Sequence, residues 1–269
     1  MLLMVRPVGA STAPQACSCS FPAAIPPRSG YPHARVKTKL TALIVACGSL
    51  ALGAIAQGAT VPVAVYTFET KGDVAAFQKA IGGSKCTKKW RQMKQMAITV
   101  GPGTTACPFR TSVVGDSTDP GSDMEVSAAA SLAANTSAKL LKKAFVGVAA
   151  RSSETSGYEL RVRPAARVWQ LFRDPRGAPG PVLHQAGKAA IKGGAKPTKI
   201  SLQAFDNGTT TTTVTAFVNG KAVLTLSDAL PDQPDGRRSV VSTGVKGSGS
   251  GSGVIGIFDN VAIRVPSPF

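Results

Sequence analysis

Short runs in which apolar and polar residues alternate dominate the chain after residue 60, and no long segment has the period of a helix. β-Branched and aromatic residues fill these runs, and Gly, Pro, Asn and Asp separate them. This spacing predicts an all-β sandwich or barrel. The predicted strands cover residues 63–68, 97–100, 111–114, 124–128, 144–151, 158–162, 167–172, 199–205, 211–218, 222–226 and 254–265.

Three local signals define connections between these strands. Asn219 and Gly220 supply the two positive φ angles of a type I′ hairpin turn. A short helical turn is expected at 73–79, capped by Asp73, with its apolar residues facing inward. Residues 247–253 alternate Gly and Ser, offer no side chain that can pack, and are predicted to form a mobile loop.

The last predicted strand carries an acid among its apolar residues. Strict alternation places Asp259 on one face with these five residues: Ile255, Ile257, Val261, Ile263 and Val265. A buried carboxylate must find hydrogen-bond donors or a cation, because leaving it unpaired costs several kcal/mol. The strand therefore predicts a specific partner for Asp259.

The first 60 residues differ in composition from the rest, since they contain no Asp or Glu and three of the five cysteines. Residues 36–56 have the basic, apolar and small-x-small regions of a secretory signal, with cleavage after Ala56 or Ala59. Two alternatives remain: a lipoprotein signal at Cys47, and an uncleaved anchor, for which the apolar run is short.

These features predict three segments. Residues 1–35 are expected to be a disordered extension or the product of a start codon placed too far upstream. Residues 36–59 form the signal peptide, and residues 60–269 form one domain. The predicted product is secreted, lies outside the cell, and has no membrane segment after cleavage.

The two cysteines of the exported domain, Cys86 and Cys107, predict a disulfide. Metal binding is the weaker alternative, because no His or further Cys lies near either residue in the sequence. The exported chain keeps 26 basic and 14 acidic residues, so its net charge is about +12. Such a field favours polyanions such as acidic cell-wall polymers. A basic surface without a dedicated partner is the alternative.

Residues 145–265 carry a family likeness in the order of their motifs. Gly-Tyr-Glu-Leu-Arg-Val, Trp-Gln-Leu-Phe-Arg, Phe-Val-Asn-Gly-Lys and a closing Phe-Asp-Asn-Val follow one another. This order resembles the concanavalin A-like lectin and glucanase jelly rolls, especially the laminin-G-like bacterial domains. The resemblance implies an antiparallel two-sheet jelly-roll sandwich whose last strand lies beside its first. It also implies that Asp259 lies where the two termini meet.

Two partners for Asp259 follow from this resemblance. In some relatives an acid at this position helps to hold a structural calcium ion, which prefers six to eight oxygen ligands. In the other interpretation Asp259 accepts hydrogen bonds from backbone N–H groups of the first strand. No other cofactor is expected.

Catalytic signals are few. The strand acids Asp123 and Glu125 are two residues apart but lack a third acid, and His184 is the single histidine of the exported chain. Tyr158 belongs to the sandwich core by its period. The protein is therefore expected to lack catalytic activity, with a polysaccharide hydrolase or lyase of the same fold, or a structural exoprotein, as alternatives.

Binding has more support from the residues. Glu125, Arg151, Glu159 and Arg161 resemble the polar concave sheet of a sugar-binding domain, or else a solvated face with cross-strand ion pairs. Trp169 could stack on a sugar or lie in the core. The sequence thus predicts a monomeric module that binds carbohydrate or the cell surface.

A basic run with one tryptophan, residues 85–94, could grip a polyanion. No nucleic-acid-binding motif accompanies it, and the export signal argues against a nucleic-acid partner. A solvated loop held by the disulfide is the other interpretation.

Overall fold

The computed structural model describes residues 59–79, 85–111, 123–153, 156–174, 182–191, 193, 195–207, 210–229, 233–234, 236–247 and 250–267. The chain divides into two units, Met1–Gly53 and Ala54–Phe269, and all the described residues belong to the second unit. The predicted extension and all of the predicted signal peptide except Ala59 lie outside the described residues. No helix in the described part has the length and apolar character needed to cross a bilayer.

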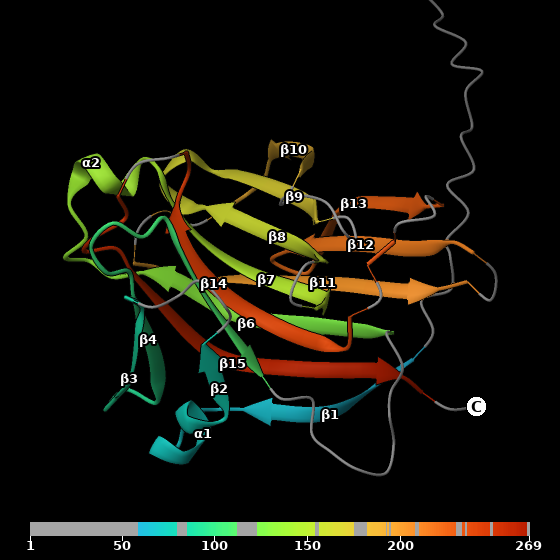
Figure 1. Cartoon of the computed structure of the whole chain (residues 1–269), viewed down its shortest axis with the longest axis horizontal. Helices are drawn as coiled ribbons and strands as arrows, with labels where there is room; N and C mark the ends of the chain where they lie inside the picture. Colours follow the sequence, from blue (N-terminus) through green and yellow to red (C-terminus); the bar gives the residue numbers. More distant parts are fainter. Residues whose placement is uncertain are drawn as a thin grey trace, which may run out of the picture. The chain divides into compact units, whose positions relative to one another are not determined.

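Two antiparallel sheets form the second unit, so the predicted all-β sandwich is confirmed (Figure 1). In the eight-stranded sheet, β15 (Ile255–Pro266) pairs with β6 (Met124–Leu132) on one side and with both β4 (Gln95–Thr99) and β1 (Thr60–Tyr66) on the other. Its strands, in spatial order, are β13 (Lys221–Asp228), β12 (Thr212–Val218), β11 (Thr198–Asp206), β6 (Met124–Leu132), β15 (Ile255–Pro266), β4 (Gln95–Thr99) and β3 (Thr87–Arg91), with β1 (Thr60–Tyr66) beside β15.

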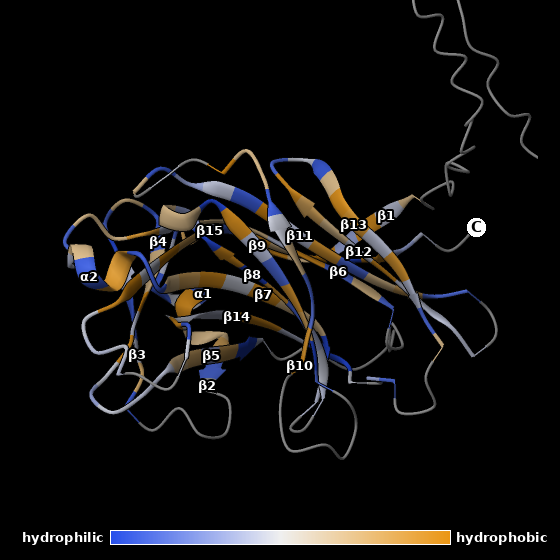
Figure 2. Ribbon diagram, turned by 90° about the horizontal axis from the view of Figure 1, so that it is seen from above, coloured by the Kyte–Doolittle hydropathy of each residue, from blue (hydrophilic) through white to orange (hydrophobic). Residues whose placement is uncertain are grey.

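The seven-stranded sheet faces the first across the core (Figures 1 and 2). Its strands, in spatial order, are β10 (Val182–Lys188), β9 (Val168–Asp174), β8 (Gly157–Arg163), β7 (Ala144–Ser152), β14 (Arg238–Val245), β5 (Ala106–Thr111) and β2 (Phe77–Lys79). Two short α-helices, α1 (Lys71–Ala75) and α2 (Ala138–Leu141), and the 3₁₀ helix η1 (Pro164–Ala166) connect strands.

Alternation along the strands builds the core between the sheets. In β8, Tyr158, Leu160 and Val162 are buried, while Glu159 and Arg161 point to the outer face. Each large apolar side chain removed from water contributes about 1.5–3 kcal/mol to folding. The central strands, such as β7, are accordingly coloured hydrophobic over most of their length in Figure 2.

The hairpin between β12 and β13 turns at Asn219 and Gly220, as predicted. Their φ angles are 52° and 77°, which is the left-handed region that a type I′ turn requires. The side-chain oxygen of Asn219 also accepts a hydrogen bond from the backbone N–H of Lys199, at 3.1 Å. The turn thus fixes the register of β12 and β13 and ties it to β11.

The first and last strands pair, as the resemblance implied, but the predicted face of β15 is wrong. A β-bulge follows Asp259, and Asn260 has a φ of 49°. The extra residue exchanges the two faces of the strand: Phe258 and Val261 both enter the main core, whereas Ile257 joins a small separate cluster.

Asp259 is half-buried at this bulge, next to the start of the β1 pairing. Its carboxylate accepts a hydrogen bond from the backbone N–H of Asn260, not from the first strand. Burial, and to a smaller extent the nearby Glu69 carboxylate, raises the pKa of Asp259. The acid in the apolar strand is therefore explained by a bulge, where the side chain leaves the core face.

The predicted disulfide between Cys86 and Cys107 is present and fully buried. The helical turn predicted at 73–79 is present only as α1, which ends at Ala75, whereas Phe77–Lys79 form strand β2. Thr70 occupies the N-cap position, and Asp73 lies within the first turn. The inward-facing apolar residues are as predicted, since Val74 and Phe77 belong to the core.

The basic run 85–94 forms β3 and the turn into β4. Lys88 points inward and donates a hydrogen bond from Nζ to the carbonyl oxygen of Val74 at the end of α1, at 2.6 Å. Burial lowers the pKa of this lysine. Trp90 also points inward, and its Nε1 donates to the carbonyl oxygen of Phe68 at 2.7 Å. Trp90 therefore anchors the hairpin and is partly buried against the core.

The Gly-Ser segment before β15 has backbone pairing in its described part. Gly251 donates to the carbonyl oxygen of Thr104 at 2.8 Å, and Gly253 donates to that of Val100 at 3.1 Å. Gly251 is buried, and a Cβ there would lie 2.9 Å from the Val100 side chain. Small residues thus let this segment pack closely against the chain between β4 and β5.

Candidate functional site

A groove of about 200 Å³ lies on the outer face of the seven-stranded sheet. It crosses β9, β8, β7, β14 and β5, which lie side by side in Figure 1. Outward-facing residues of these strands and of the β7–β8 connection line it: Ala106, Pro108, Arg110, Ala149, Ser152, Ser153, Ser156, Gly157, Glu159, Arg161, Phe172, Asp174, Val240 and Ser242.

Glu159 on β8 is held from both sides. One carboxylate oxygen accepts a hydrogen bond from the Ser242 hydroxyl at 2.5 Å, and the other accepts from Nη2 of Arg161 at 2.6 Å. Gly147 lies beneath this contact, since a Cβ there would be 2.7 Å from the Ser242 hydroxyl. A glycine on β7 therefore makes room for an oriented carboxylate on the groove floor.

Arg161 is fixed by aromatic rings as well as by Glu159. Its guanidinium lies 4.6 Å from the centroid of the Phe145 ring and 4.3 Å from that of Phe172. Such cation–π contacts and the ion pair restrict the side chain to one position. Glu159 and Arg161 are together on one face, as the sequence predicted.

Asp174, at the end of β9, is the second carboxylate of the groove. Its Oδ1 atom is buried and has no hydrogen-bond partner among the described residues. Burial is the main cause of a raised pKa at Asp174, the charge of Glu159 adds to it, and Arg161 opposes it.

A raised pKa in the folded state means that folding disfavours the ionised form of Asp174. The stability contribution of the protonated acid is full below the unfolded-state pKa and is lost as pH rises through the folded-state pKa. We expect Asp174→Asn to raise the free energy of unfolding at about pH 7 and to change it little at about pH 3. Urea unfolding at both pH values, with exposed Glu69→Gln as control, measures this. Destabilisation at neutral pH would contradict the expectation.

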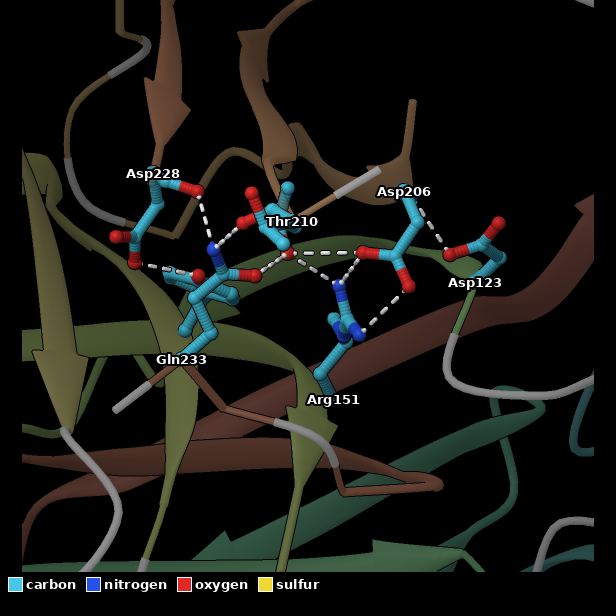
Figure 3. A network of polar contacts seen from close by, with 8 residues as sticks. Asp123, Arg151, Asp206, Thr210, Asp228 and Gln233 are labelled. Carbon is cyan, nitrogen blue, oxygen red and sulfur yellow. Dashed lines mark hydrogen bonds and ion pairs between the residues drawn. The ribbon is translucent and has the colours of Figure 1, made fainter. Parts of the chain in front are cut away.

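The expectation that Arg151 shares this surface is wrong. Ala150 and Arg151 on β7 together oppose a single residue of β14, so a bulge interrupts the alternation, and Arg151 has a φ of 52°. The side chain therefore turns inward and is 4% exposed. Its guanidinium donates to the Asp206 carboxylate at 2.6 and 3.1 Å and to the Thr212 hydroxyl at 2.6 Å (Figure 3).

Arg151 belongs to a polar network that joins the two sheets at one end of the sandwich (Figure 3). Gln233 accepts from the Thr212 hydroxyl at 2.7 Å and donates to the backbone carbonyl of Asp228 at 2.7 Å. The Asp228 carboxylate accepts from the Tyr158 hydroxyl at 2.6 Å and from Nε of Arg173 at 2.5 Å.

Asp123 continues the network at its other end. Its carboxylate accepts from the backbone N–H of Asp206 at 2.8 Å, and its pKa is raised, chiefly by burial. Two ion pairs thus link strands of opposite sheets: Arg151 with Asp206, and Arg173 with Asp228. The network tethers the sheets and lies apart from the groove lining.

The other predicted ligand residues lie elsewhere. Glu125 points from β6 to the outer face of the eight-stranded sheet, so it cannot act with Glu159. Trp169 is 4% exposed and packs in the core, which confirms the core alternative. Gly187 allows this position, because a Cβ there would lie 2.8 Å from the Trp169 ring.

The candidate catalytic and metal residues also lie outside the groove. His184 is exposed on β10, and Tyr158 is buried in the core. Within the described ranges, no group of three or more His, Cys, Asp or Glu side chains could hold a metal ion. Calcium at Asp259 stays a prediction that no contact of this residue supports.

Sequence reasoning missed four groove residues that come from strands far apart in the chain: Arg110, Phe172, Asp174 and Ser242. The alternation of buried and exposed residues along β9 could have predicted that Phe172 and Asp174 point outward. Arg110 and Ser242 could not have been found, because only the pairing of β5 with β14 and of β14 with β7 brings them to Glu159.

Comparison with solved structures identifies the fold. An endo-1,3-β-glucanase from Streptomyces sioyaensis superposes with a TM-score of 0.54 at 11% identity, covering 78% of this chain and 97% of its own. Carbohydrate binding module CBM66 from Bacillus subtilis gives 0.50 at 12%, covering 70% and 95%. A β-glucanase from Bacillus licheniformis gives 0.50 at 12%, covering 78% and 100%.

These similarities define the class of protein by its fold: the chain contains a two-sheet jelly-roll sandwich domain like those of these proteins. No protein-family model and no curated protein matches it. The structurally similar proteins include both a binding module and glucanases, so the fold is compatible with binding and with catalysis.

Proposed function

We propose that the domain binds a carbohydrate chain in the groove on the outer face of the seven-stranded sheet. The observation that carries this proposal is the oriented Glu159 carboxylate on the floor of a groove whose lining also contains Asp174 and Phe172. Each carboxylate oxygen can accept more than one hydrogen bond. Glu159, whose side chain is 18% exposed, can therefore receive sugar hydroxyl groups, while Phe172 offers apolar contact.

The charges of the groove favour a neutral glycan. The lining contains two arginines, Arg110 and Arg161, and two acids, Glu159 and Asp174, so the formal charges cancel. The net positive charge of the chain lies outside the groove, and the basic run 85–94 belongs to strands of the other sheet. The carboxylates of a uronate polymer would be repelled by the two acids, whereas the hydroxyl groups of a neutral glycan can donate hydrogen bonds to acidic side chains.

We place this activity outside the cell. The signal-like sequence at 36–59 and a disulfide, which persists in oxidising compartments, support export. A secreted monomer that binds polysaccharide is consistent with both. Detection of the mature chain in culture medium, with its N-terminus sequenced, tests the location.

Calorimetric titration with soluble polysaccharides tests the binding proposal. We expect laminarin or mixed-linkage β-glucan to bind, and alginate and polygalacturonate to bind less well. Glu159→Gln should lower affinity about tenfold, because it removes a charged acceptor and releases Arg161. Glu69→Gln is the matched control, since Glu69 is exposed at 53% and lies outside the groove lining.

Unchanged affinity of the Glu159→Gln protein would overturn the assignment of the groove. Preferential binding of the two uronate polymers would overturn the neutral-glycan assignment and support the acidic polymer as the partner. Equal losses in the Glu69 and Glu159 variants would show an effect of surface charge alone.

A glycoside hydrolase of the same fold is the second candidate, favoured by the raised pKa of Asp174 beside Glu159. Hydrolases use one protonated and one ionised carboxyl group on either side of the scissile bond. Release of reducing ends from laminarin or mixed-linkage glucan, lost in both Glu159→Gln and Asp174→Asn, would establish this function. Binding without release of reducing ends is the result expected for a binding module.

A further inference from the structure

The opposite outer face of the sandwich carries a hollow of its own. It has a volume of about 190 Å³ and lies on the eight-stranded sheet, so it is separate from the groove. Six residues line it: Glu125, Lys199, Ser201, Gln203, Phe217 and Gly220. They come from β6, β11, β12 and the turn that follows β12.

Glu125 is fixed at the centre of this face. Its carboxylate accepts hydrogen bonds from the Ser201 hydroxyl at 2.7 Å and from the Gln203 amide at 3.1 Å. Arg264 on β15 lies 3.7 Å away, and the Glu125 side chain is 13% exposed. The Thr60 hydroxyl on β1 also lies 3.5 Å from this carboxylate. A carboxylate held by side chains of β11, β15 and β1 and still partly exposed in the hollow is an oriented acceptor for a ligand hydroxyl.

Phe217 forms an apolar wall beside these polar groups. It pairs with Ser201 across β12 and β11 and is half-buried on the outer face. The neighbouring outward residues Ser127 and Thr215 have small side chains, which are 4% and 5% exposed. A short polar floor beside an aromatic ring is suited to a sugar, whose apolar ring face stacks while its hydroxyls bond.

The hairpin turn forms one end of the hollow. Gly220 has a φ of 77°, and apart from its chain neighbours no atom of the described residues lies within 4 Å of the position of a Cβ. Lys199 stands at the same end and can donate to a hydroxyl or ring oxygen. Both hydrogen-bond donors and acceptors therefore surround one aromatic ring.

We propose that this hollow is a second saccharide site, which takes a neutral pyranose unit of a glycan chain. It goes beyond the groove function and rests on different strands and residues. Because the two sites lie on opposite outer faces, one short saccharide cannot occupy both. The domain thus holds two glycan chains at once, and its avidity for a polysaccharide exceeds the affinity of either site.

Titration with laminarihexaose tests the second site in four proteins: wild type, Glu159→Gln, Phe217→Ala and the double variant. We expect two binding sites per wild-type chain and one in Phe217→Ala, with affinity at the remaining groove site unchanged. The double variant should bind at least about tenfold more weakly than either single variant. Phe217→Trp should tighten the second site about threefold, because a larger ring stacks better.

The midpoint temperature of thermal unfolding is the control: each variant should unfold at the same temperature as the wild type, which would show that it is folded. If the wild type binds one saccharide per chain, and if Phe217→Ala and Phe217→Trp bind with the same affinity as the wild type, the second site is overturned. The groove assignment then stays intact. Binding lost in Phe217→Ala but unchanged in Glu159→Gln would support the second site and overturn the groove assignment. Absence of binding in all four proteins would overturn both.

Discussion

Replacing Asp228 by alanine is expected to destabilise the protein by about 3–5 kcal/mol, the largest effect of any single change considered. The Asp228 carboxylate is buried and accepts hydrogen bonds from Tyr158 and Arg173. Arg173 is itself 7% exposed, so the variant leaves a buried positive charge without this counter-charge. Breaking one side of a buried ion pair costs more than the pair contributes, because desolvation is no longer offset. Chemical denaturation measures the loss.

Asp259→Ala is the matched control for Asp228→Ala. Asp259 is a half-exposed acid at the bulge of β15, and its loss should cost less than about 1 kcal/mol. A second comparison uses Asp228→Leu with Arg173→Met, which removes both charges and should recover part of the stability. Equal losses at Asp228 and Asp259 would contradict the role of the network and favour a stabilising carboxylate where the termini meet.

Loss of the disulfide is expected to lower the free energy of unfolding by about 3 kcal/mol. Cys86 and Cys107 are separated by 21 residues, and in the chain-entropy model a cross-link of this length restricts the unfolded chain by about that amount. The paired change to alanine is preferred to serine, because both positions are fully buried and burying a hydroxyl costs free energy that burying a methyl group does not. Guanidinium unfolding of the two proteins gives the difference.

Dithiothreitol provides the control for the disulfide prediction. It should lower the unfolding midpoint of the wild type and leave that of the double alanine variant unchanged. A wild type that is insensitive to the reductant, or a variant as stable as the wild type, would show that the cross-link adds no stability. The result bears on fold stability alone, since neither cysteine lines the groove or the second hollow.

Alternation along the chain was sufficient to predict most strands, and local residue chemistry was sufficient for the hairpin at Asn219 and Gly220. Both signals are local, because side chains of a strand alternate and few residues adopt positive φ. The same alternation placed Glu159 and Arg161 correctly on the outer face. It misplaced Arg151, where a bulge between β7 and β14 reverses the phase.

The sequence by itself determined an all-β sandwich, its disulfide, and two of the residues that line the groove. Only the tertiary structure decided which strands lie side by side, where bulges exchange the faces of β7 and β15, and that Glu125 and Glu159 lie on opposite sides. The physical reason is that strand register is set by non-local pairing. A single extra residue opposite a partner strand sends every later side chain to the other face.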